Sequence, residues 1–371
     1  MIFRRSWGKV KARTAALREG RPERRHLMND SPTVSRHTRF GDVLRLPGLA
    51  PFKNQLLLGP KGSPQNPFYA RLTIGQLERM TPAWRHADLV SGLEFARQEA
   101  AARQLRSLPL YTPEELREDP TRAKASLLFL PGKPGAPYAI IAPGGAYINV
   151  AITVEGLPVG ARLHEAGYHV FLLQYRCGRR GQLPKPFQDM QAALRYITAH
   201  AEALQVRPTD YAVFGFSAGG HVAASTGTLN FGYSAIGLPK PACIVLGYPL
   251  VSLEERNMAV NSFLQLYMGR TWRSTLPPTY ILDHMDKTYP PTYLWQCRDD
   301  EILPFHGNGL AFSKRAKELG VECRFRPVDK GGHGMGVALN SEAQGWLEEA
   351  IAFWEAHQAF VSDIRSSRSR V

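Results

Sequence analysis

The chain has 371 residues, 44% of them hydrophobic and 21% charged, which is enough apolar material for one large α/β core or two ordinary domains. This composition excludes disorder, collagen and coiled coil as descriptions of the whole chain. No stretch reaches the roughly 18 apolar residues that a membrane-spanning helix needs, and the basic N-terminus lacks the apolar segment of a signal peptide. We therefore expect a cytoplasmic protein with no membrane partner. Four scattered cysteines without a CxxC pair predict reduced thiols rather than a disulfide framework.

The net charge of +14 is concentrated at the two ends of the chain. Residues 1–27 hold nine Lys and Arg against Glu19 and Glu23, a net +7, and the tail 361–371 carries three Arg against one Asp. We expect both ends to be solvated, disordered extensions, with Met28 as a candidate natural start. The rest of the chain lacks the basic and aromatic interleaving of a nucleic-acid groove, so nucleic acid is not an expected partner.

Residues 28–124 are expected to form a helical and loop region that packs on the core. Apolar residues recur with helical spacing in FGDVLRL, TIGQLERM and ADLVSGLEFARQEAAARQLRSL, and prolines separate these segments. This region contains no motif that indicates chemistry.

From residue 125 to about 360 the pattern changes to short apolar runs that alternate with amphipathic stretches. Strands are predicted at 138–143, 169–176, 211–215, 242–250, 292–297 and 321–328, and helices near 153–166, 187–203, 218–228, 307–319 and 342–358. Such alternation indicates an α/β domain with a mostly parallel central sheet that carries helices on both faces. Residues 252–290 interrupt the alternation and are expected to form a small cap insertion over the carboxyl edge of the sheet.

The strongest motif is GFSAGGH at 215–221, between the strand YAVFG and a helix of small residues. A serine between two glycines at such a junction is typical of a nucleophile elbow, a strained turn that projects the hydroxyl above the sheet edge. The motif G-x-S-x-G is weak alone, but the strand before it and the helix after it make it specific. We therefore predict that Ser217 is a nucleophile.

A serine nucleophile needs a histidine base and a carboxylate that orients it, in the chain order Ser, Asp or Glu, His for this fold. KGGHGMG (330–336) follows a predicted strand and supplies His333, the histidine with flanking glycines and the right chain order. RDDEILP (298–304) follows another predicted strand. The offset of four residues before Pro304 selects Asp300, and Asp299 remains the alternative.

The other histidines fit worse. His164 and His169 resemble an HExxH pair but are five residues apart, with Gly167 expected to end the helix between them, so no zinc site is predicted. His221 points down the helix after the serine and is expected to be a packed core histidine. His306 follows the acidic loop and is a candidate to line the pocket.

The turn after the strand at 138–143 reads PGGAY, where hydrolases of this fold carry an HGGG-type motif. An oxyanion hole uses backbone N–H groups, so alanine can replace the third glycine. We assign the hole to Gly145, Ala146 and Ala218, with Gly144 setting the turn.

Taken together, residues 125–358 resemble an α/β-hydrolase of the esterase/lipase superfamily and are similar to small acetylesterases, including acetyl-xylan-esterase-like proteins. The resemblance rests on APGGAY, LLQYR with the following PKPFQDMQAALRYI, GFSAGGHVA, PPTYLWQCRDDEILP and KGGHGMG. It implies hydrolysis of short-chain carboxylic esters through an acyl-enzyme, without a cofactor or metal.

The sequence thus predicts a serine hydrolase that acts on short-chain esters, such as O-acetyl groups on carbohydrates or small molecules. An arylformamidase or a peptidase of the same fold would use the same parts. A module that binds anions through the basic N-terminal arm is an alternative of another class. The acyl-chain preference and the oligomeric state are not predicted.

Overall fold

The computed structural model describes residues 34–59, 65–81, 83–178, 183–252 and 276–359. Both basic extensions, 1–27 and 361–371, and most of the expected cap insertion fall outside the described residues. Within the described part, residues 276–290 of the insertion contain the short helices η6 (Pro277–Thr279) and η7 (Leu282–His284).

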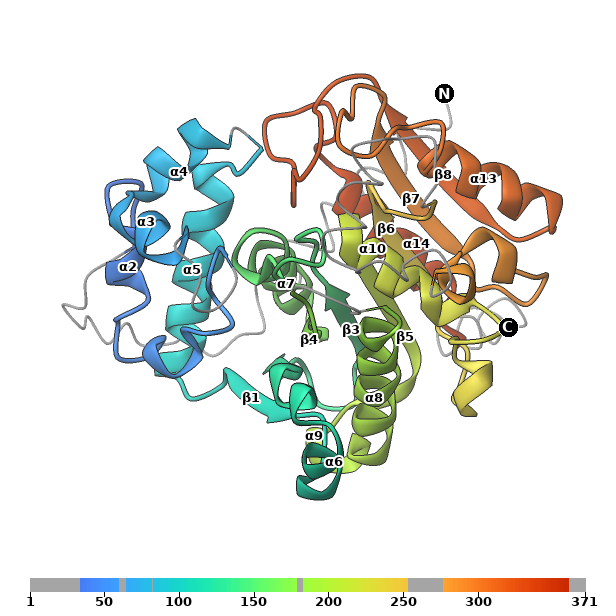
Figure 1. Ribbon diagram of the computed structural model, residues 1–371, viewed down its shortest axis with the longest axis horizontal. Coiled ribbons are helices and arrows are strands. Elements are labelled where there is room, and N and C mark those ends of the chain that lie inside the picture. The colour runs from blue at the N-terminus through green and yellow to red at the C-terminus, as the bar shows by residue number, and fades with distance from the viewer. Residues whose placement is uncertain (1–33, 60–64, 82, 179–182, 253–275, 360–371) are drawn as a thin grey trace, which may run out of the picture. The chain divides into compact units, whose positions relative to one another are not determined.

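Eight strands in the described residues form one sheet in the order β1-β2-β4-β3-β5-β6-β7-β8 (Figure 1). Their bounds are β1 Arg106–Pro109, β2 Ser126–Leu130, β3 Pro137–Ala142, β4 His169–Gln174, β5 Arg207–Phe216, β6 Cys243–Gly247, β7 Thr292–Cys297 and β8 Cys323–Val328. The pairs β1–β2 and β2–β4 are antiparallel, and the pairs from β4 to β8 are parallel. The central strands β3, β6 and β7 are buried along their whole length, which explains their continuous apolar sequences. The predicted mostly parallel α/β fold is therefore confirmed.

Two layers of helices cover the sheet. The helices α8 (Lys185–Ala199), α10 (Ser217–Ala224) and α13 (Gly309–Glu318) lie on one face, where α10 contacts β3, β5 and β6 and α13 contacts β7 and β8. The helices α7 (Leu157–Glu165) and α14 (Trp346–Ala356) lie on the other face, α7 against β4 and α14 against β6 and β7. The further helices are α9 (Ala201–Leu204), η3 (Ile152–Gly156), η4 (Ser225–Gly227) and η5 (Ser234–Ile236).

The N-terminal region contains α2 (Phe40–Val43), η1 (Ala50–Phe52), α3 (Gln65–Arg71), α4 (Ile74–Met80), α5 (His86–Ala101), α6 (Pro113–Glu118) and η2 (Pro120–Lys124). The helix α5 of this region packs on α7. Gly92 of α5 lies against Pro158 of α7, so close that an added Cβ would come within 2.9 Å of the proline nitrogen. The expectation of helix and loop in this region omits β1, the edge strand of the sheet.

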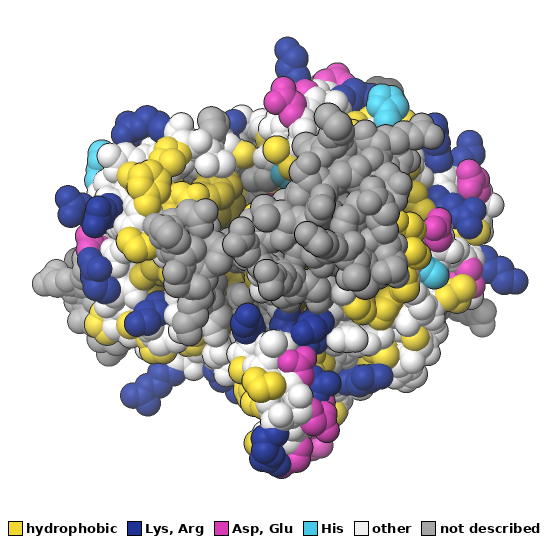
Figure 2. All heavy atoms as spheres, in the orientation of Figure 1, with side chains coloured by type: hydrophobic (Ala, Val, Ile, Leu, Met, Phe, Trp, Pro, Cys, Tyr) yellow, Lys and Arg dark blue, Asp and Glu magenta, His cyan; other side chains and the backbone are white. Residues whose placement is uncertain are grey.

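Charged side chains on the face shown in Figure 2 are spread out, with Lys and Arg interspersed with Asp and Glu. Hydrophobic side chains gather in the same view over the N-terminal helices, where Phe68 of α3 is 49% and Met80 of α4 is 52% exposed. Among the described residues, no helix combines the length and the apolar composition needed to cross a membrane. The four cysteines are free.

Candidate active site

Ser217 occupies a tight turn between β5 and α10. Its φ is +52°, in the left-handed region that L residues rarely adopt. The turn closes because Gly219 packs directly on the end of β3: a Cβ there would lie 2.1 Å from the carbonyl oxygen of Ala142. A strained serine between a buried strand and a helix has the geometry of a nucleophile elbow.

His333 links Ser217 to Asp300. Its Nε2 lies 2.8 Å from Ser217 Oγ, and its Nδ1 lies 2.8 Å from Asp300 Oδ2. In the sequence, His333 is 116 positions from Ser217 and 33 positions from Asp300. Ser217, Asp300 and His333 follow the carboxyl ends of β5, β7 and β8 respectively. Because parallel strands end at one edge of the sheet, three separate loops deliver one hydrogen-bonded chain of groups.

The two neighbouring aspartates have different partners. Asp300 is buried and contacts the imidazole, whereas Asp299 accepts hydrogen bonds from the backbone N–H groups of Gly331 and Gly332, at 3.0 and 2.9 Å to Oδ1. Asp299 thus holds the loop that carries His333 without touching its ring. The structure brings together the residues that the offset from Pro304 selected.

The turn of Gly145 and Ala146 packs against Ser217. The adjoining Gly144 lies so close that an added Cβ would come within 2.8 Å of Ser217 Cβ. The φ angles of Gly145 and Ala146 are +124° and +54°, and the carbonyl of Gly145 accepts the N–H of Ile148 at 2.9 Å.

The N–H groups assigned to the oxyanion hole are available for a ligand. No acceptor within the described ranges takes the N–H of Gly145 or Ala146. Ala218 lies in the first turn of α10, where an N–H has no partner inside the helix. The assignment of these three groups to an oxyanion hole stays a prediction.

Glu155 was not anticipated from the sequence. It is only 4% exposed, and it lies on η3, a π-helical turn between the Gly144 loop and α7. Its Oε2 accepts the N–H of Gly144, and its Oε1 accepts the hydroxyl of Tyr248 at 2.9 Å. One feature of the sequence could have indicated it: Glu155 is the one charged residue between positions 144 and 161, a stretch whose composition is typical of a buried core.

His221 is a buried core histidine, as expected. Its Nε2 lies 2.8 Å from the carbonyl oxygen of Thr279, so this nitrogen carries the proton, and its Nδ1 accepts the hydroxyl of Tyr147 at 2.8 Å. Burial lowers the pKa of His221 to about 4, so the ring is neutral at physiological pH. It anchors the segment after the Gly145 turn to α10. His306 is exposed and packs against Phe305.

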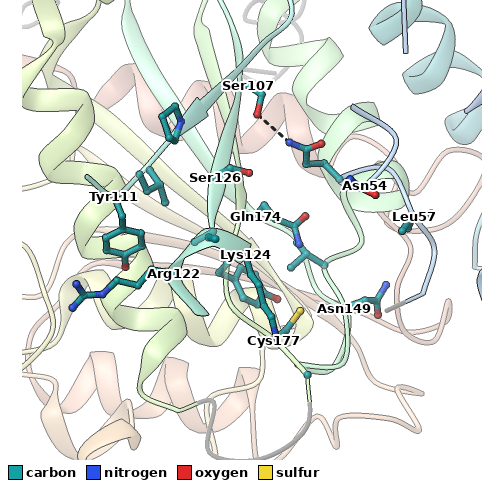
Figure 3. Close-up of a pocket in the computed structure, with 18 of the residues that line it drawn as sticks. Asn54, Leu57, Ser107, Tyr111, Arg122, Lys124, Ser126, Asn149, Gln174 and Cys177 are labelled. Carbon is teal, nitrogen blue, oxygen red and sulfur yellow. Dashed lines mark hydrogen bonds between the residues drawn. The ribbon is translucent and has the colours of Figure 1, made fainter. Parts of the chain in front are cut away.

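The loop that bears Gly145 also borders a cavity of about 960 Å³ (Figure 3). Four amide side chains line it, from Asn54, Gln55, Asn149 and Gln174, together with serine and tyrosine hydroxyls and the cations Arg122 and Lys124. No Asp or Glu is among its lining residues. The buried Oε1 of Gln174 has no hydrogen-bond partner within the described part of the chain. The lining therefore combines hydrogen-bond donors and acceptors with apolar side chains such as Leu57, Leu110 and Ile148, and it does not include Ser217 or His333.

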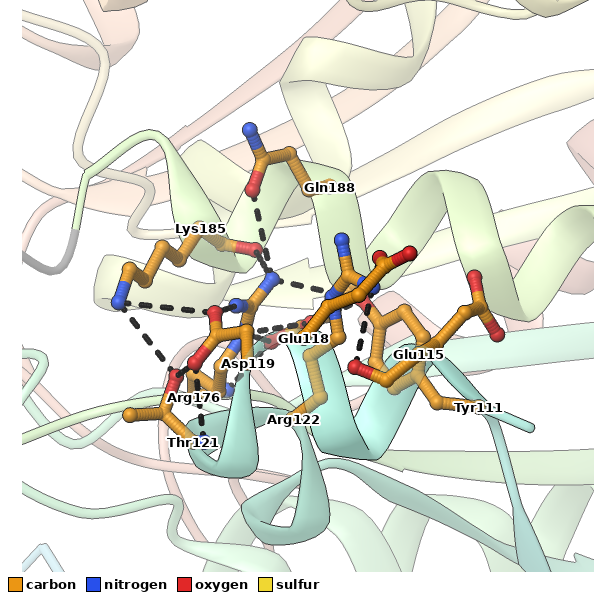
Figure 4. A network of polar contacts seen from close by, with 10 residues as sticks. Tyr111, Glu115, Glu118, Asp119, Thr121, Arg122, Arg176, Lys185 and Gln188 are labelled. Carbon is orange, nitrogen blue, oxygen red and sulfur yellow. Dashed lines mark hydrogen bonds and ion pairs between the residues drawn. The ribbon is translucent and has the colours of Figure 1, made fainter. Parts of the chain in front are cut away.

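Arg176 belongs to a network of polar contacts that includes Tyr111, one of the residues lining this cavity (Figure 4). It is 2% exposed, its Nε lies 2.9 Å from Asp189 Oδ1, and its NH1 lies 3.0 Å from Asp119 Oδ2. The hydroxyl of Tyr111 donates to the same Asp189 carboxylate. Burial raises the pKa of Asp189, and the adjacent guanidinium of Arg176 opposes this. The ion pair of Arg176 and Asp189 gives the sequence segments LLQYR and PFQDM a structural role. It connects the end of β4 to α8 and, through Tyr111, to the segment after β1.

The helix α7 ends at Glu165, so His164 and His169 lie on a helix and on a strand respectively. Within the described ranges, no three His, Cys, Asp or Glu side chains are placed to hold a metal ion.

The fold and the arrangement of Ser217, His333 and Asp300 define the class as the α/β-hydrolases. Similarity to solved structures agrees. The acetyl ester-xyloside bifunctional hydrolase from Caldicellulosiruptor lactoaceticus matches with a TM-score of 0.58 at 27% identity, over 68% of this chain and 96% of that one. The esterase Est2 from Thermogutta terrifontis shares the fold with a TM-score of 0.56 at 20% identity, over 69% of this chain and 94% of that one.

Residues 128–314, about half of the chain, match the family model BD-FAE, and the chain belongs to this family. It is similar to an acetylxylan esterase of Xylanibacter ruminicola, with 26% identity over 229 residues, 61% of this chain and 46% of the relative. It is also similar to an ethyl acetate hydrolase of Pseudomonas putida, with 24% identity over 65% of this chain and 74% of the relative. The chain thus spans less than half the length of the acetylxylan esterase.

Proposed function

We propose that this protein is a carboxylic ester hydrolase that removes short acyl groups, above all acetyl, from a carbohydrate. The observation that carries the proposal is the continuous hydrogen-bonded chain from Ser217 Oγ through His333 to Asp300, at the edge of the sheet where the elbow lies. This arrangement activates a hydroxyl that would otherwise be a poor nucleophile.

In the first half of the reaction, Ser217 Oγ attacks the ester carbonyl carbon and its proton moves to His333 Nε2. Asp300 accepts the hydrogen bond from Nδ1 and stabilises the imidazolium that forms. The carbonyl oxygen becomes negative and accepts hydrogen bonds from the N–H groups of Gly145, Ala146 and Ala218. When the tetrahedral intermediate collapses, the bond to the alcohol oxygen breaks, and that oxygen takes the proton from His333.

In the second half, water attacks the acyl-enzyme. His333 takes a proton from the water, the new tetrahedral intermediate collapses, and Ser217 leaves with the proton that His333 returns. The products are the carboxylic acid and the free serine, so every atom is accounted for without another reactant.

Two observations support a carbohydrate as the alcohol half. The cavity bordered by residues 148–150 carries amide and hydroxyl groups that can form hydrogen bonds with a ligand rich in hydroxyls. The relatives include proteins described as an acetylxylan esterase and as an acetyl ester-xyloside hydrolase.

The test is a series of kcat/KM values for p-nitrophenyl esters of increasing acyl length, together with an acetylated xylo-oligosaccharide, an N-formyl aryl amine and a short peptide. We expect acetyl esters to be the best substrates and Ser217→Ala to lose at least about 10⁴-fold. A Ser217→Ala variant that keeps a tenth of the activity would exclude Ser217 as the nucleophile. Faster turnover of the formyl amide or the peptide would assign the protein to one of those activities instead.

A further inference from the structure

We propose that Glu155 is a positioning residue for this site. Its buried carboxylate joins the turn at residues 144–146, here called the oxyanion loop, to the loop of His333, and it supports the positive charge that forms on the imidazole. The proposal rests on the proposed function, because it concerns the same serine, histidine and backbone N–H groups.

The connection runs through Tyr248, the residue directly after β6. The hydroxyl of Tyr248 lies 2.9 Å from Glu155 Oε1 and accepts the N–H of Gly336 at 2.9 Å. Gly336 is three residues after His333 in the same loop, and its carbonyl accepts the indole N–H of Trp346 at 3.1 Å. One carboxylate therefore bonds to the loop before η3 and, through one hydroxyl, to the loop after β8.

The hydrogen atoms in this chain of contacts define the direction of each bond. A tyrosine hydroxyl has one proton, and since the N–H of Gly336 already donates to Tyr248, that proton is donated to Glu155. The N–H of Gly144 donates to the other oxygen. Both carboxylate oxygens act as acceptors, and neither of these side-chain hydrogen bonds has Glu155 as its donor. The arrangement therefore fits the ionised carboxylate.

The surroundings of Glu155 place this charge close to the reacting groups. Burial raises the pKa of Glu155, whereas the hydrogen bonds from Gly144 and Tyr248 and the attraction of His333 oppose that rise. The ring of Tyr248 also packs against that of His333, with 4.9 Å between centroids. When His333 takes the serine proton, its positive charge interacts with both Asp300 and Glu155.

The titratable groups around this pair come from several elements. Tyr248 follows β6, Asp300 follows β7, and Tyr175 follows β4 and donates its hydroxyl to the carbonyl of Pro143 at 2.7 Å. Glu155 and Asp300 are the two carboxylates among them, so only these two supply negative charge in this set. Replacing Glu155 by glutamine removes one of them while keeping the size of the side chain.

The experiment compares Glu155→Gln, Glu155→Asp and Tyr248→Phe with the matched control Glu99→Gln, which alters the other glutamate that is buried in the described residues. We expect Glu155→Gln to lower kcat about 10²-fold with KM changed less than about threefold, since one loop contact is lost at the oxyanion hole. The acidic limb of its kcat/KM profile should move to lower pH by about 0.5 unit or more, because the imidazolium loses a nearby negative charge.

The other variants separate the effect of the negative charge on Glu155 from the effect of the hydrogen-bonded link through Tyr248. Tyr248→Phe keeps the carboxylate, so kcat should fall while the acidic limb stays in place, and Glu155→Asp should restore the limb toward the wild-type position. Glu99→Gln should change neither quantity. If Glu155→Gln does not fold, the Tyr248→Phe and Glu155→Asp profiles still decide the matter.

The proposal is overturned if Glu155→Gln loses activity only in proportion to its folded fraction, with the acidic limb unmoved. Wild-type kcat in Tyr248→Phe would also overturn it. The pH profile for inactivation by a fluorophosphonate gives the same limb without an ester substrate, since Ser217 attacks phosphorus, fluoride leaves and His333 takes the proton. A failure of the proposed ester substrate is thereby distinguished from a failure of the role of Glu155.

Discussion

Replacing Asp300 by asparagine should reverse the imidazole tautomer, and the contacts of the carboxylate show how. Oδ1 accepts the backbone N–H groups of Ile302 at 3.0 Å and Leu303 at 2.9 Å, and Oδ2 accepts Gln296 Nε2 at 3.2 Å and faces His333 Nδ1. Asparagine has one acceptor oxygen, and we expect that oxygen to occupy the Oδ1 position, where it accepts the N–H groups of Ile302 and Leu303. Its NH₂ group then occupies the Oδ2 position.

This NH₂ group donates to His333 Nδ1 and moves the ring proton to Nε2, the nitrogen that must accept the proton of Ser217. We expect kcat to fall about 10⁴-fold, as for an asparagine in this role in other triads. Such a loss corresponds to about 5 kcal/mol of transition-state stabilisation.

Asp299→Asn is the matched comparison, one residue away with the same change of charge. Oδ1 of Asp299 already accepts both Gly331 and Gly332, so one amide oxygen can keep both bonds. We expect a loss of less than about tenfold, since the His333 loop stays in place. Steady-state kcat for p-nitrophenyl acetate, with circular dichroism to confirm folding, measures both variants. A greater loss in Asp299→Asn would show that the carboxylate acting on His333 is Asp299.

Two predictions concern regions outside the site. Asp88 on α5 is 4% exposed, its carboxylate has no hydrogen-bond partner among the described residues, and burial raises its pKa to about 6 despite Arg162 and Arg85. Because the pKa of Asp88 is raised in the folded state, the protonated side chain favours folding, and this contribution is lost as pH rises through about 6. Asp88→Asn should therefore add at most about 3 kcal/mol to the free energy of unfolding at pH 7.5 and nothing below pH 4. Urea denaturation at both pH values checks this, and an equal gain at both would contradict it. Removal of residues 1–27 should leave kcat/KM for p-nitrophenyl acetate within about twofold of wild type and weaken retention on a cation exchanger, because net +7 is lost; loss of the cooperative melt would show that this segment packs on the core.

The parallel strands β3, β4 and β7 could be predicted from the sequence because both of their faces are buried. The ranges 138–143, 169–176 and 292–297 match β3, β4 and β7 to within two residues. The predicted strand 242–250 is longer than β6, which ends at Gly247, because Tyr248 adopts a φ of +36° and leaves the sheet. A run of apolar letters does not reveal such a turn.

The antiparallel edge of the sheet could not be predicted in the same way. β1 has the sequence RSLP with mostly exposed residues, directly after the helical pattern of α5, and β2 is the short run SLLFL. The strand conformation of β2 depends on pairing with β4, which begins 39 residues after β2 ends, and that of β1 depends in turn on pairing with β2. Local periodicity contains no information on such pairing.

Ser217, Asp300 and His333 could be predicted because each follows a strand and each has a local motif. Glu155 has no such motif. Its partners Gly144 and Tyr248 are 11 and 93 residues away, and they become neighbours only when β3 and β6 lie in one sheet. Burial of a single acidic residue is a signal that something compensates its charge, but the sequence does not identify the partners.

The buried carboxylates of Asp300 and Glu155 have different kinds of hydrogen-bond partner. They therefore differ in which loops must be in place before each carboxylate is satisfied. Asp300 is held by backbone N–H groups of its own loop and by Gln296, whose Oε1 accepts the N–H of Gly309 at the start of α13. Glu155 bonds only to groups from other segments. Folding of the β7 loop is therefore sufficient to orient Asp300, whereas Glu155 is satisfied only when the oxyanion loop and the His333 loop are both in place. A buried charge without its partners is costly, so this carboxylate favours the state in which both loops are assembled before substrate binds.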